Sequence, residues 1–215
     1  MIRIEGLRVA FGRTTALDSV EVDLSPGVTG LFGPNGSGKS TLLRVLAGLL
    51  RPTAGRVTLD GAPVTAADEA FRRRVGFVGH EAGLYPRLSI AENLHLFCRL
   101  YGVAHARAAT VLEQLGLGPH ATLPVGALSA GTKRRAGLAR ALLHEPDVLL
   151  VDEPYANLDD AAGELASEAI KEWRRPSRFG VIATHGAKKL KSYADAGIVL
   201  RRGQVVAAGS YRRDR

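Results

Sequence analysis

Residues 33–40 read GPNGSGKS and match the phosphate-loop pattern G-x-x-x-x-G-K-[ST]. A polyphosphate needs many N–H donors close to its oxygens, and glycines permit that approach because they have no Cβ. The apolar run 28–32 predicts a buried strand before the loop, and 41–49 has helical apolar spacing after it. This context disfavours the alternative of a glycine-rich turn that matches by chance. The sequence therefore predicts a strand, an anion-binding loop and a helix in direct succession.

Each position of the loop has an expected role. Lys39 places a point charge on the β- and γ-phosphates, and the hydroxyl of Ser40 is a ligand for Mg²⁺. A helix over about 39–47 would turn the positive end of its dipole toward the anion. The predicted nucleotide-binding residues here are Gly33, Pro34, Asn35, Gly36, Ser37, Gly38, Lys39, Ser40 and Thr41.

A second motif supplies carboxylates. The apolar run 148–151 predicts a buried strand, and Asp152 and Glu153 follow it directly. Ligands of open α/β sheets bind at the carboxyl ends of strands, so this is a suitable place for a metal ligand and a base. We expect Asp152 to contact Mg²⁺ and Glu153 to be the general base that polarises the attacking water. An acidic turn at the end of a strand is the plainer alternative, and the upstream phosphate loop disfavours it.

The composition disfavours membrane-spanning, secreted, disulfide-bonded and zinc-binding proteins. The 215 residues contain no run of 18 apolar residues, which predicts no membrane-spanning helix. The N-terminus lacks the apolar centre of a signal peptide. The single cysteine, Cys98, allows neither an intrachain disulfide nor a cysteine-based zinc site, and its apolar neighbours predict an ordinary buried thiol. We expect a cytoplasmic protein.

The formal net charge of +8 has three possible readings: a solvated basic surface, attraction to an anionic membrane surface, or nucleic-acid binding. The basic residues are scattered along the chain, and no aromatic residues alternate with them as stacking platforms. The pattern favours solvated faces first and membrane attraction second, so no nucleic-acid partner is expected.

The pattern of elements predicts one α/β domain over 1–215. Its core comprises roughly 1–85 and 146–215, and the stretch 86–145 is a helical insert. Predicted strands cover 2–4, 7–11, 20–24, 28–32, 55–60, 75–78, 148–151 and 181–184, with a hairpin of 197–200 and 204–208. Predicted helices cover 39–47, 89–101, 105–115 and 161–174, with another from about 129.

Further motifs stand in a fixed order. Leu128-Ser129-Ala130-Gly131-Thr132 resembles the signature L-S-G-G-Q of ABC transporter ATP-binding subunits, and 133–142 resembles its helical continuation. Residues 156–159 resemble the D-loop of that family, Thr184-His185 its switch histidine, and Phe11 the aromatic that stacks on adenine. The resemblance covers nearly the whole chain.

The resemblance implies the ABC ATPase fold: a P-loop core with a mixed sheet, an N-terminal antiparallel β subdomain and an inserted helical subdomain. It implies ATP and Mg²⁺, separate transmembrane subunits, and attachment to the inner face of the cell membrane. It also implies a homodimer with composite ATP sites, in which Ser129 and Gly131 contact the ATP of the second copy. His185 would contact the γ-phosphate and hold the water and Glu153, while Phe11 would stack on adenine.

The chain departs from the family pattern at three places. Ala130 replaces the first signature glycine, and Thr132 replaces the glutamine. His80 stands where the family has the Q-loop glutamine. We expect His80 to reach Mg²⁺-bound water, with Glu81 as the alternative.

Short matches narrow the subfamily. The runs 79–81, 84–86, 91–94 and 99–102 resemble the ATP-binding subunit of the haem exporter of cytochrome c biogenesis. ABC-2 type drug or polysaccharide export ATPases share much of this pattern and remain the alternative. A non-transport ABC ATPase acting on nucleic acid is disfavoured because the chain has no long coiled coil, no zinc module and no second ATPase unit. A non-catalytic regulator is disfavoured because the catalytic residue types are all present.

Overall fold

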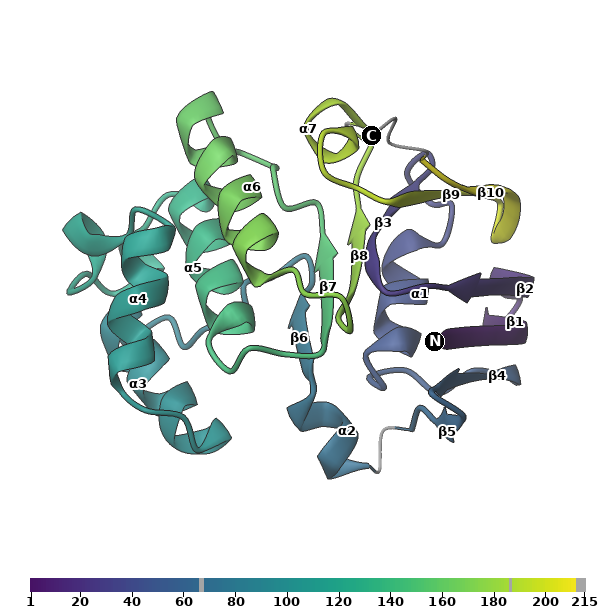
Figure 1. The fold of residues 1–215 in the computed structure, drawn as a ribbon, viewed down its shortest axis with the longest axis horizontal. Helices are drawn as coiled ribbons and strands as arrows, with labels where there is room; N and C mark the ends of the chain where they lie inside the picture. The colour runs from purple at the N-terminus through teal and green to yellow at the C-terminus, as the bar shows by residue number, and fades with distance from the viewer. Residues whose placement is uncertain (66–67, 186, 212–215) are drawn as a thin grey trace.

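The computed structural model describes residues 1–65, 68–185 and 187–211. In these ranges the strands form two sheets, an antiparallel one in the order β2-β1-β4-β5 and a six-stranded one in the order β10-β9-β3-β8-β7-β6 (Figure 1). The second sheet is mixed: β10 is antiparallel to β9 and the other pairs are parallel. The strands are β1 (Ile2–Phe11), β2 (Thr14–Leu24), β3 (Gly27–Phe32), β4 (Ala54–Leu59), β5 (Ala62–Pro63), β6 (Val75–Val78), β7 (Val148–Asp152), β8 (Phe179–Ala183), β9 (Ala196–Arg201) and β10 (Gln204–Ser210).

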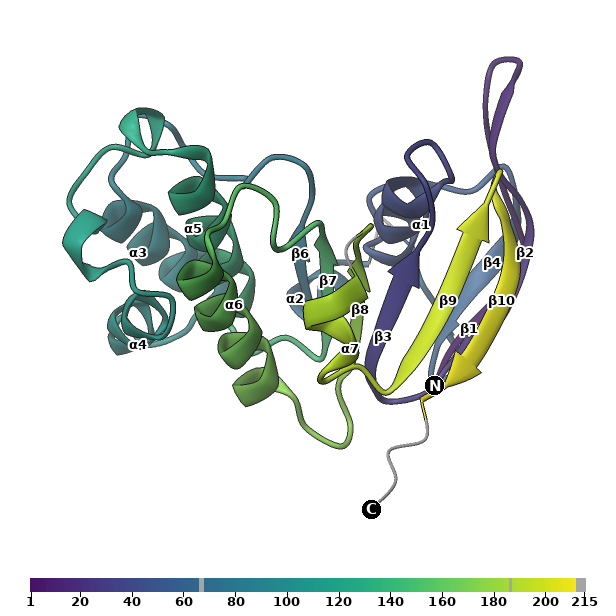
Figure 2. The ribbon, with the colours of Figure 1, turned by 90° about the horizontal axis from the view of Figure 1, so that it is seen from above.

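The helices lie in two places (Figures 1 and 2). α1 packs between the two sheets, while α3 to α6 gather on the other side of the six-stranded sheet. None of the helices in the described ranges is both long and apolar enough to cross a bilayer. The helices are α1 (Lys39–Leu46), α2 (Glu69–Arg73), α3 (Ile90–Tyr101), α4 (Ala106–Gln114), α5 (Ala130–Leu142), α6 (Asp160–Trp173) and α7 (Ala187–Lys191), with 3-10 turns at Gly118–His120 and Val125–Ala127.

The strand β7 is buried on both faces, as its continuous apolar sequence predicts. Successive side chains of a strand point to opposite faces. Leu149 and Val151 accordingly pack in the cluster that the helices α3 to α6 form with the sheet, and Val148 and Leu150 pack in the cluster around α1. The carboxyl end of β7 therefore lies at the edge of two hydrophobic cores.

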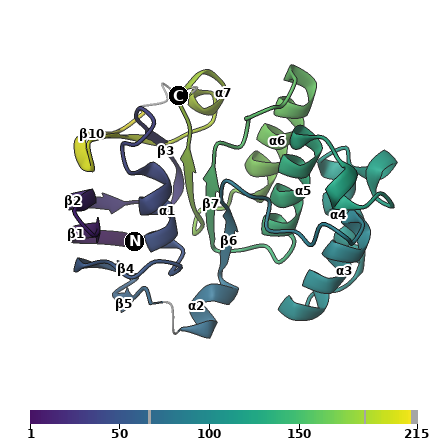
Figure 3. The same cartoon turned by 180° about the vertical axis from the view of Figure 1, so that it is seen from behind.

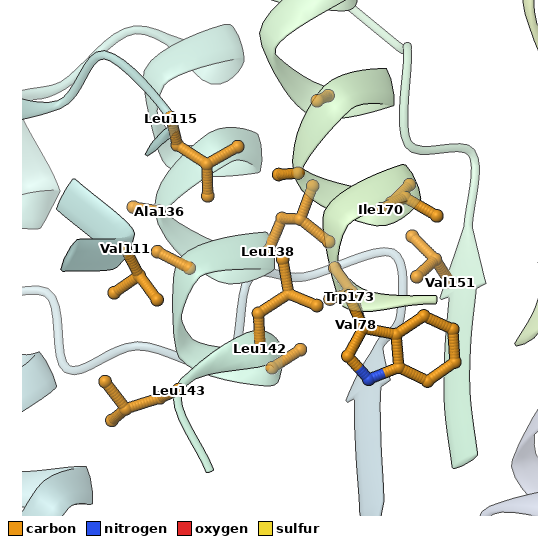
Figure 4. Packing of buried hydrophobic residues seen from close by; sticks show 14 of the residues in the cluster. Val78, Val111, Leu115, Ala136, Leu138, Leu142, Leu143, Val151, Ile170 and Trp173 are labelled. Carbon is orange, nitrogen blue, oxygen red and sulfur yellow. The ribbon is translucent and has the colours of Figure 1, made fainter. Parts of the chain in front are cut away.

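Residues 86–145, called here the helical segment, pack directly on the sheet. Figure 4 shows Leu138 and Leu142 of α5 next to Val78 of β6 and to Ile170 and Trp173 of α6, while Val111 of α4 packs on the other side of α5. The start of α3 is fixed by a capping box, in which the Ser89 hydroxyl accepts from the Glu92 N–H at 3.1 Å and the Glu92 carboxylate accepts from the Ser89 N–H at 2.7 Å. Seen from behind, helices α3 to α6 lie on the side of the molecule away from the antiparallel sheet (Figure 3).

The observed elements differ from the predicted ones in a few places. Strand β1 is continuous where two short strands were expected, because a positive φ of 54° at Gly6 accommodates a register shift within it. The five-residue helices α2 and α7 and the two-residue strand β5 were not predicted. Elements this short have too few residues to establish a periodic pattern.

Candidate nucleoside triphosphate site

Two glycines in the loop between β3 and α1 leave no room for a side chain. Gly33 has φ 150° and Gly38 has φ 104°. A Cβ on Gly33 would lie 2.2 Å from the carbonyl oxygen of Leu200, and one on Gly38 would lie 2.6 Å from that of Ala16. Glycine is therefore required at both positions, both by backbone conformation and by space.

The polar groups of this loop are arranged around its interior. The Lys39 ammonium donates to the carbonyls of Gly33 at 2.8 Å and of Pro34 at 3.1 Å, and Lys39 is only 6% exposed. Ser37 has a buried hydroxyl with no hydrogen-bond partner among the described residues. Helix α1 begins at its N-cap, Gly38, with no side-chain cap. The loop thus combines a buried cation with an uncapped helix N-terminus, which suits an anion.

The other loop residues lie around this centre. Pro34, Asn35 and Gly36 are exposed at the tip of the loop, and Thr41 is half-buried in the first turn of α1. Their nucleotide-binding roles stay predictions.

Ser40 and Asp152 meet although 112 residues separate them. The Ser40 hydroxyl donates to a carboxylate oxygen of Asp152 at 2.5 Å, and Asp152, at the end of β7, is buried. Hydroxyl and carboxylate oxygens are ligand types that Mg²⁺ prefers, and Mg²⁺ usually completes its shell with phosphate oxygens and water. The described residues contain no cluster of three or more histidine, cysteine, aspartate or glutamate side chains suited to a metal. As two oxygen ligands, Ser40 and Asp152 fit a Mg²⁺ ion whose remaining ligands are phosphate and water oxygens.

Glu153 and His185 also come together. The Glu153 carboxylate accepts from the His185 backbone N–H at 3.0 Å and lies 2.9 Å from the His185 ring Nδ1. Thr184 donates its hydroxyl to the other carboxylate oxygen at 3.1 Å. The ring of His185 is 71% exposed, whereas the Glu153 side chain is 22% exposed. A carboxylate at the edge of the core is thus held next to an exposed imidazole.

The signature residues lie at the start of α5, away from the phosphate loop. Ser129 is the N-cap and accepts from the Thr132 N–H at 3.1 Å. A Cβ on Gly131 would lie 2.4 Å from the carbonyl oxygen of Asn157, so the first turn of α5 packs closely on the segment after β7. Within the described part of the chain, no hydrogen bond or ion pair joins Ser129 or Gly131 to the phosphate loop. The expected arrangement, in which they complete another copy's site, stays a prediction.

Two further predicted residues lie on the surface. Phe11 is 53% exposed at the end of β1, and the β1–β2 turn projects at the same end of the molecule as the loop before α1 (Figure 2). His80 follows β6 and lines a groove of about 640 Å³ together with Glu153 and Asn157. In the part of the chain that the structure describes, no hydrogen bond or ion pair joins the His80 ring to Ser40 or Asp152, so its metal role stays a prediction.

Two residues of the site were not singled out from the sequence. Thr184 holds the Glu153 carboxylate, and Arg134 donates to the carbonyls of Asp152 and Glu153. A polar residue that ends an apolar strand was the available signal for Thr184. For Arg134, the available signal was its spacing: it lies four residues before Leu138, on the face of α5 that is buried.

A family model and two relatives of known name agree on the family of this chain. The family model described as ABC transporter matches residues 17–156. The ABC transporter ATP-binding protein NatA of Bacillus subtilis (strain 168) is 33% identical over 91% of this chain and 82% of its own length. The Nod factor export ATP-binding protein I of Ralstonia nicotianae (strain ATCC BAA-1114 / GMI1000) is 35% identical over 97% of this chain and 67% of its own.

A solved structure agrees with the family model and with the predicted fold. The dimeric post-hydrolysis state of the ATP-binding cassette MJ0796 bound to ADP and Pi matches 99% of this chain and 100% of its own, with 28% identity and a TM-score of 0.89. The mixed sheet with an antiparallel N-terminal sheet, expected from the motifs, is thereby confirmed as the ABC ATPase fold. This chain therefore belongs to the ABC transporter family, as an ATP-binding subunit.

Proposed function

We propose that this chain binds ATP with Mg²⁺ at the phosphate loop and hydrolyses it to power transport through separate membrane subunits. The observation that carries the proposal is the pair of contacts at one end of β7. Ser40 meets Asp152 there, and the next residue, Glu153, is held beside His185. A phosphate cradle, a metal-ligand pair and a base are the parts that phosphoryl transfer to water requires.

The roles follow from the chemistry of each group. Lys39 and the loop N–H groups bind the phosphate oxygens, and Ser40 and Asp152 would hold Mg²⁺, which neutralises charge on the phosphates when bound. Glu153 polarises a water molecule, whose oxygen bonds to the γ-phosphorus while the bond to the bridging β,γ-oxygen breaks. The products are ADP and inorganic phosphate. His185 stabilises the γ-phosphate and keeps the Glu153 carboxylate oriented.

We propose that two copies close head to tail around two ATP molecules. Ser129 and Gly131, at the exposed start of α5, then contact the nucleotide held by the other copy, and Phe11 stacks on adenine. Hydrolysis would remove the phosphate contacts that hold the copies together, and the dimer would open. The surface around 80–86, which lines the groove next to Glu153, would pass this change to membrane subunits at the inner face of the membrane. No nucleic-acid partner is proposed.

The cargo has two candidates. The sequence runs 79–81 and 84–86 support haem export in cytochrome c maturation, and the similarity to a Nod factor export protein supports ABC-2 type export of drugs or polysaccharides. Under either proposal the chain would power export. Stimulation of ATP hydrolysis by haem, in the complex with the membrane subunits, would decide for the first, and stimulation by a glycan would decide for the second.

The Glu153→Gln variant tests the hydrolytic proposal. The amide keeps the shape of the side chain but cannot accept the proton, so we expect a loss of turnover of about 100-fold or more, with ATP binding retained. Size-exclusion chromatography with Mg-ATP should give a dimer for this variant. Lys39→Ala is the matched control, since it should abolish both binding and dimer formation. A Glu153→Gln protein that stays monomeric with bound ATP would contradict the composite site.

A further inference from the structure

Arg134 is a buried cation that donates to the backbone at the ends of two neighbouring strands. Its Nε donates to the carbonyl of Glu153 at 3.0 Å, and its Nη2 donates to that of Asp152. Its Nη1 donates to the carbonyls of Gly79 at 2.6 Å and His80 at 3.4 Å. One side chain thus contacts four carbonyls, two after β6 and two at the end of β7.

These contacts cross between two parts of the fold. Arg134 belongs to α5 in the helical segment, whereas β6 and β7 are adjacent parallel strands of the six-stranded sheet. The residue is only 9% exposed, so its carbonyl partners replace the water that a guanidinium would otherwise bind. A guanidinium has five N–H donors in a rigid planar arrangement, and a lysine ammonium cannot reproduce this set.

The backbone that Arg134 holds is itself unusual. Glu153 has φ 50°, a left-handed conformation that a residue with a long side chain rarely adopts. Such a conformation persists only where the surroundings fix it, and it sets the direction of the carboxylate. Three hydrogen bonds reach the Glu153 backbone: its N–H donates to the Ala183 carbonyl at 2.8 Å, and its carbonyl accepts from the Ala156 N–H at 3.2 Å and from Arg134. The first comes from the neighbouring strand and the second from the turn that follows Glu153, so Arg134 supplies the one that comes from the helical segment.

We propose that Arg134 is a positioning residue that makes the orientation of the base Glu153 depend on where α5 lies. The inference rests on the proposed hydrolytic role of Glu153. When α5 and the segment after β6 lie as in this structure, the guanidinium holds the Glu153 backbone in its left-handed conformation. A displacement of the helical segment, or of residues 79–80, breaks that set of hydrogen bonds and lets the carboxylate turn away from the reacting water.

Two neighbouring arginines on α5 provide comparisons. Arg135 donates to the carbonyls of Leu115 at 2.6 Å and Gly116 at 3.0 Å, both within the helical segment. Arg140 donates to the carbonyls of Phe77 in β6 and Ala82 in the segment after β6, and neither partner is at the end of β7. Of these three arginines, only Arg134 contacts Glu153, so Arg135 is the matched control.

The test compares Arg134→Lys with Arg135→Lys. Arg134→Lys should lower kcat for ATP hydrolysis by about ten-fold or more and leave the Kd for a fluorescent ATP analogue within about three-fold, because the phosphate loop is untouched. Arg135→Lys should keep kcat within about two-fold. Hydrogen exchange should become faster in peptides covering 79–85 and 153–159 for Arg134→Lys and stay unchanged there for Arg135→Lys.

A double variant separates positioning from general loss of stability. If Arg134 acts through Glu153, Arg134→Lys should have no further effect on the residual single-turnover rate of Glu153→Gln. Additive losses, an unchanged kcat for Arg134→Lys, or equal losses for both lysine variants would overturn the inference. If the unaltered chain hydrolyses no ATP, the proposed function fails instead, and hydrogen exchange still decides whether Arg134 fixes residues 153–159.

Discussion

The hydroxyls of Tyr155 and Tyr193 are hydrogen-bonded to each other, which joins the segment after β7 to the segment after α7. The Tyr155 hydroxyl also lies 3.3 Å from the Ser167 hydroxyl, which donates its one proton to the Gly163 carbonyl at 2.9 Å within α6. Tyr193 is only 2% exposed. Burial raises the pKa of both phenols, so both hydroxyls keep their protons at neutral pH.

The two single phenylalanine substitutions should have unequal effects on stability. In Tyr155→Phe, the buried Tyr193 hydroxyl loses its described partner, which should cost about 1–3 kcal/mol of the free energy of unfolding. In Tyr193→Phe, the Tyr155 hydroxyl keeps Ser167, so the expected cost is about 0.5–1.5 kcal/mol. The double variant leaves no orphaned phenol. It should therefore cost less than the sum of the two, with a coupling free energy of about 1 kcal/mol.

Urea unfolding measures these differences directly. Trp173 is the only tryptophan of the chain and is buried at the end of α6, so its fluorescence reports loss of the native packing. The m-values should stay equal among the four proteins, so that changes in midpoint report changes in stability. The melting temperature should fall by about 2–4 °C for each kcal/mol lost.

Two results would refute the reasoning. The first is a larger loss for Tyr193→Phe than for Tyr155→Phe, since only Tyr155 has a second hydroxyl partner. The second is strict additivity in the double variant, which would mean that the two hydroxyls do not stabilise each other.

Two further predictions concern stability. Burial lowers the pKa of His144, stacked on the Tyr101 ring, from 6.5 to about 4. The unfolded chain therefore binds this proton first as the pH falls, so the free energy of unfolding should decline between pH 6.5 and 4, by up to about 3 kcal/mol from this group. In urea unfolding at several pH values, His144→Phe should show a shallower decline, and parallel curves would contradict this. Gly33→Ala should prevent binding of a fluorescent ATP analogue, because its Cβ would lie 2.2 Å from the Leu200 carbonyl oxygen; unchanged affinity would contradict this.

Local sequence was sufficient where a short pattern fixes both conformation and chemistry. The phosphate loop and the strand ending at Asp152 were predicted within a residue of their observed bounds, since glycine spacing and a continuous apolar run have few structural solutions. The helix starting at Ser129 was also predicted from its N-cap.

The parts of the site that the sequence did not predict depend on contacts between residues far apart in the chain. Arg134 reads as one basic residue among several on α5, and only the folded chain shows that its partners are carbonyls 18–55 residues away. The contact between Ser40 and Asp152 could be expected from the two motifs. The hydrogen bond from Thr184 to Glu153 joins residues 31 positions apart, and the sequence marks Thr184 only as a polar residue after an apolar strand.

The two-sided burial of β7 has a consequence for how the chain unfolds. Leu149 and Leu150 are adjacent in sequence yet belong to different hydrophobic clusters, so neither cluster can be exposed to solvent without disturbing the same strand. The phosphate-loop side and the helical side are thus expected to melt in one cooperative transition rather than as independent units. The strand common to both halves ends at Asp152, so Asp152 and Glu153 lie at the end of an element that both clusters hold in place.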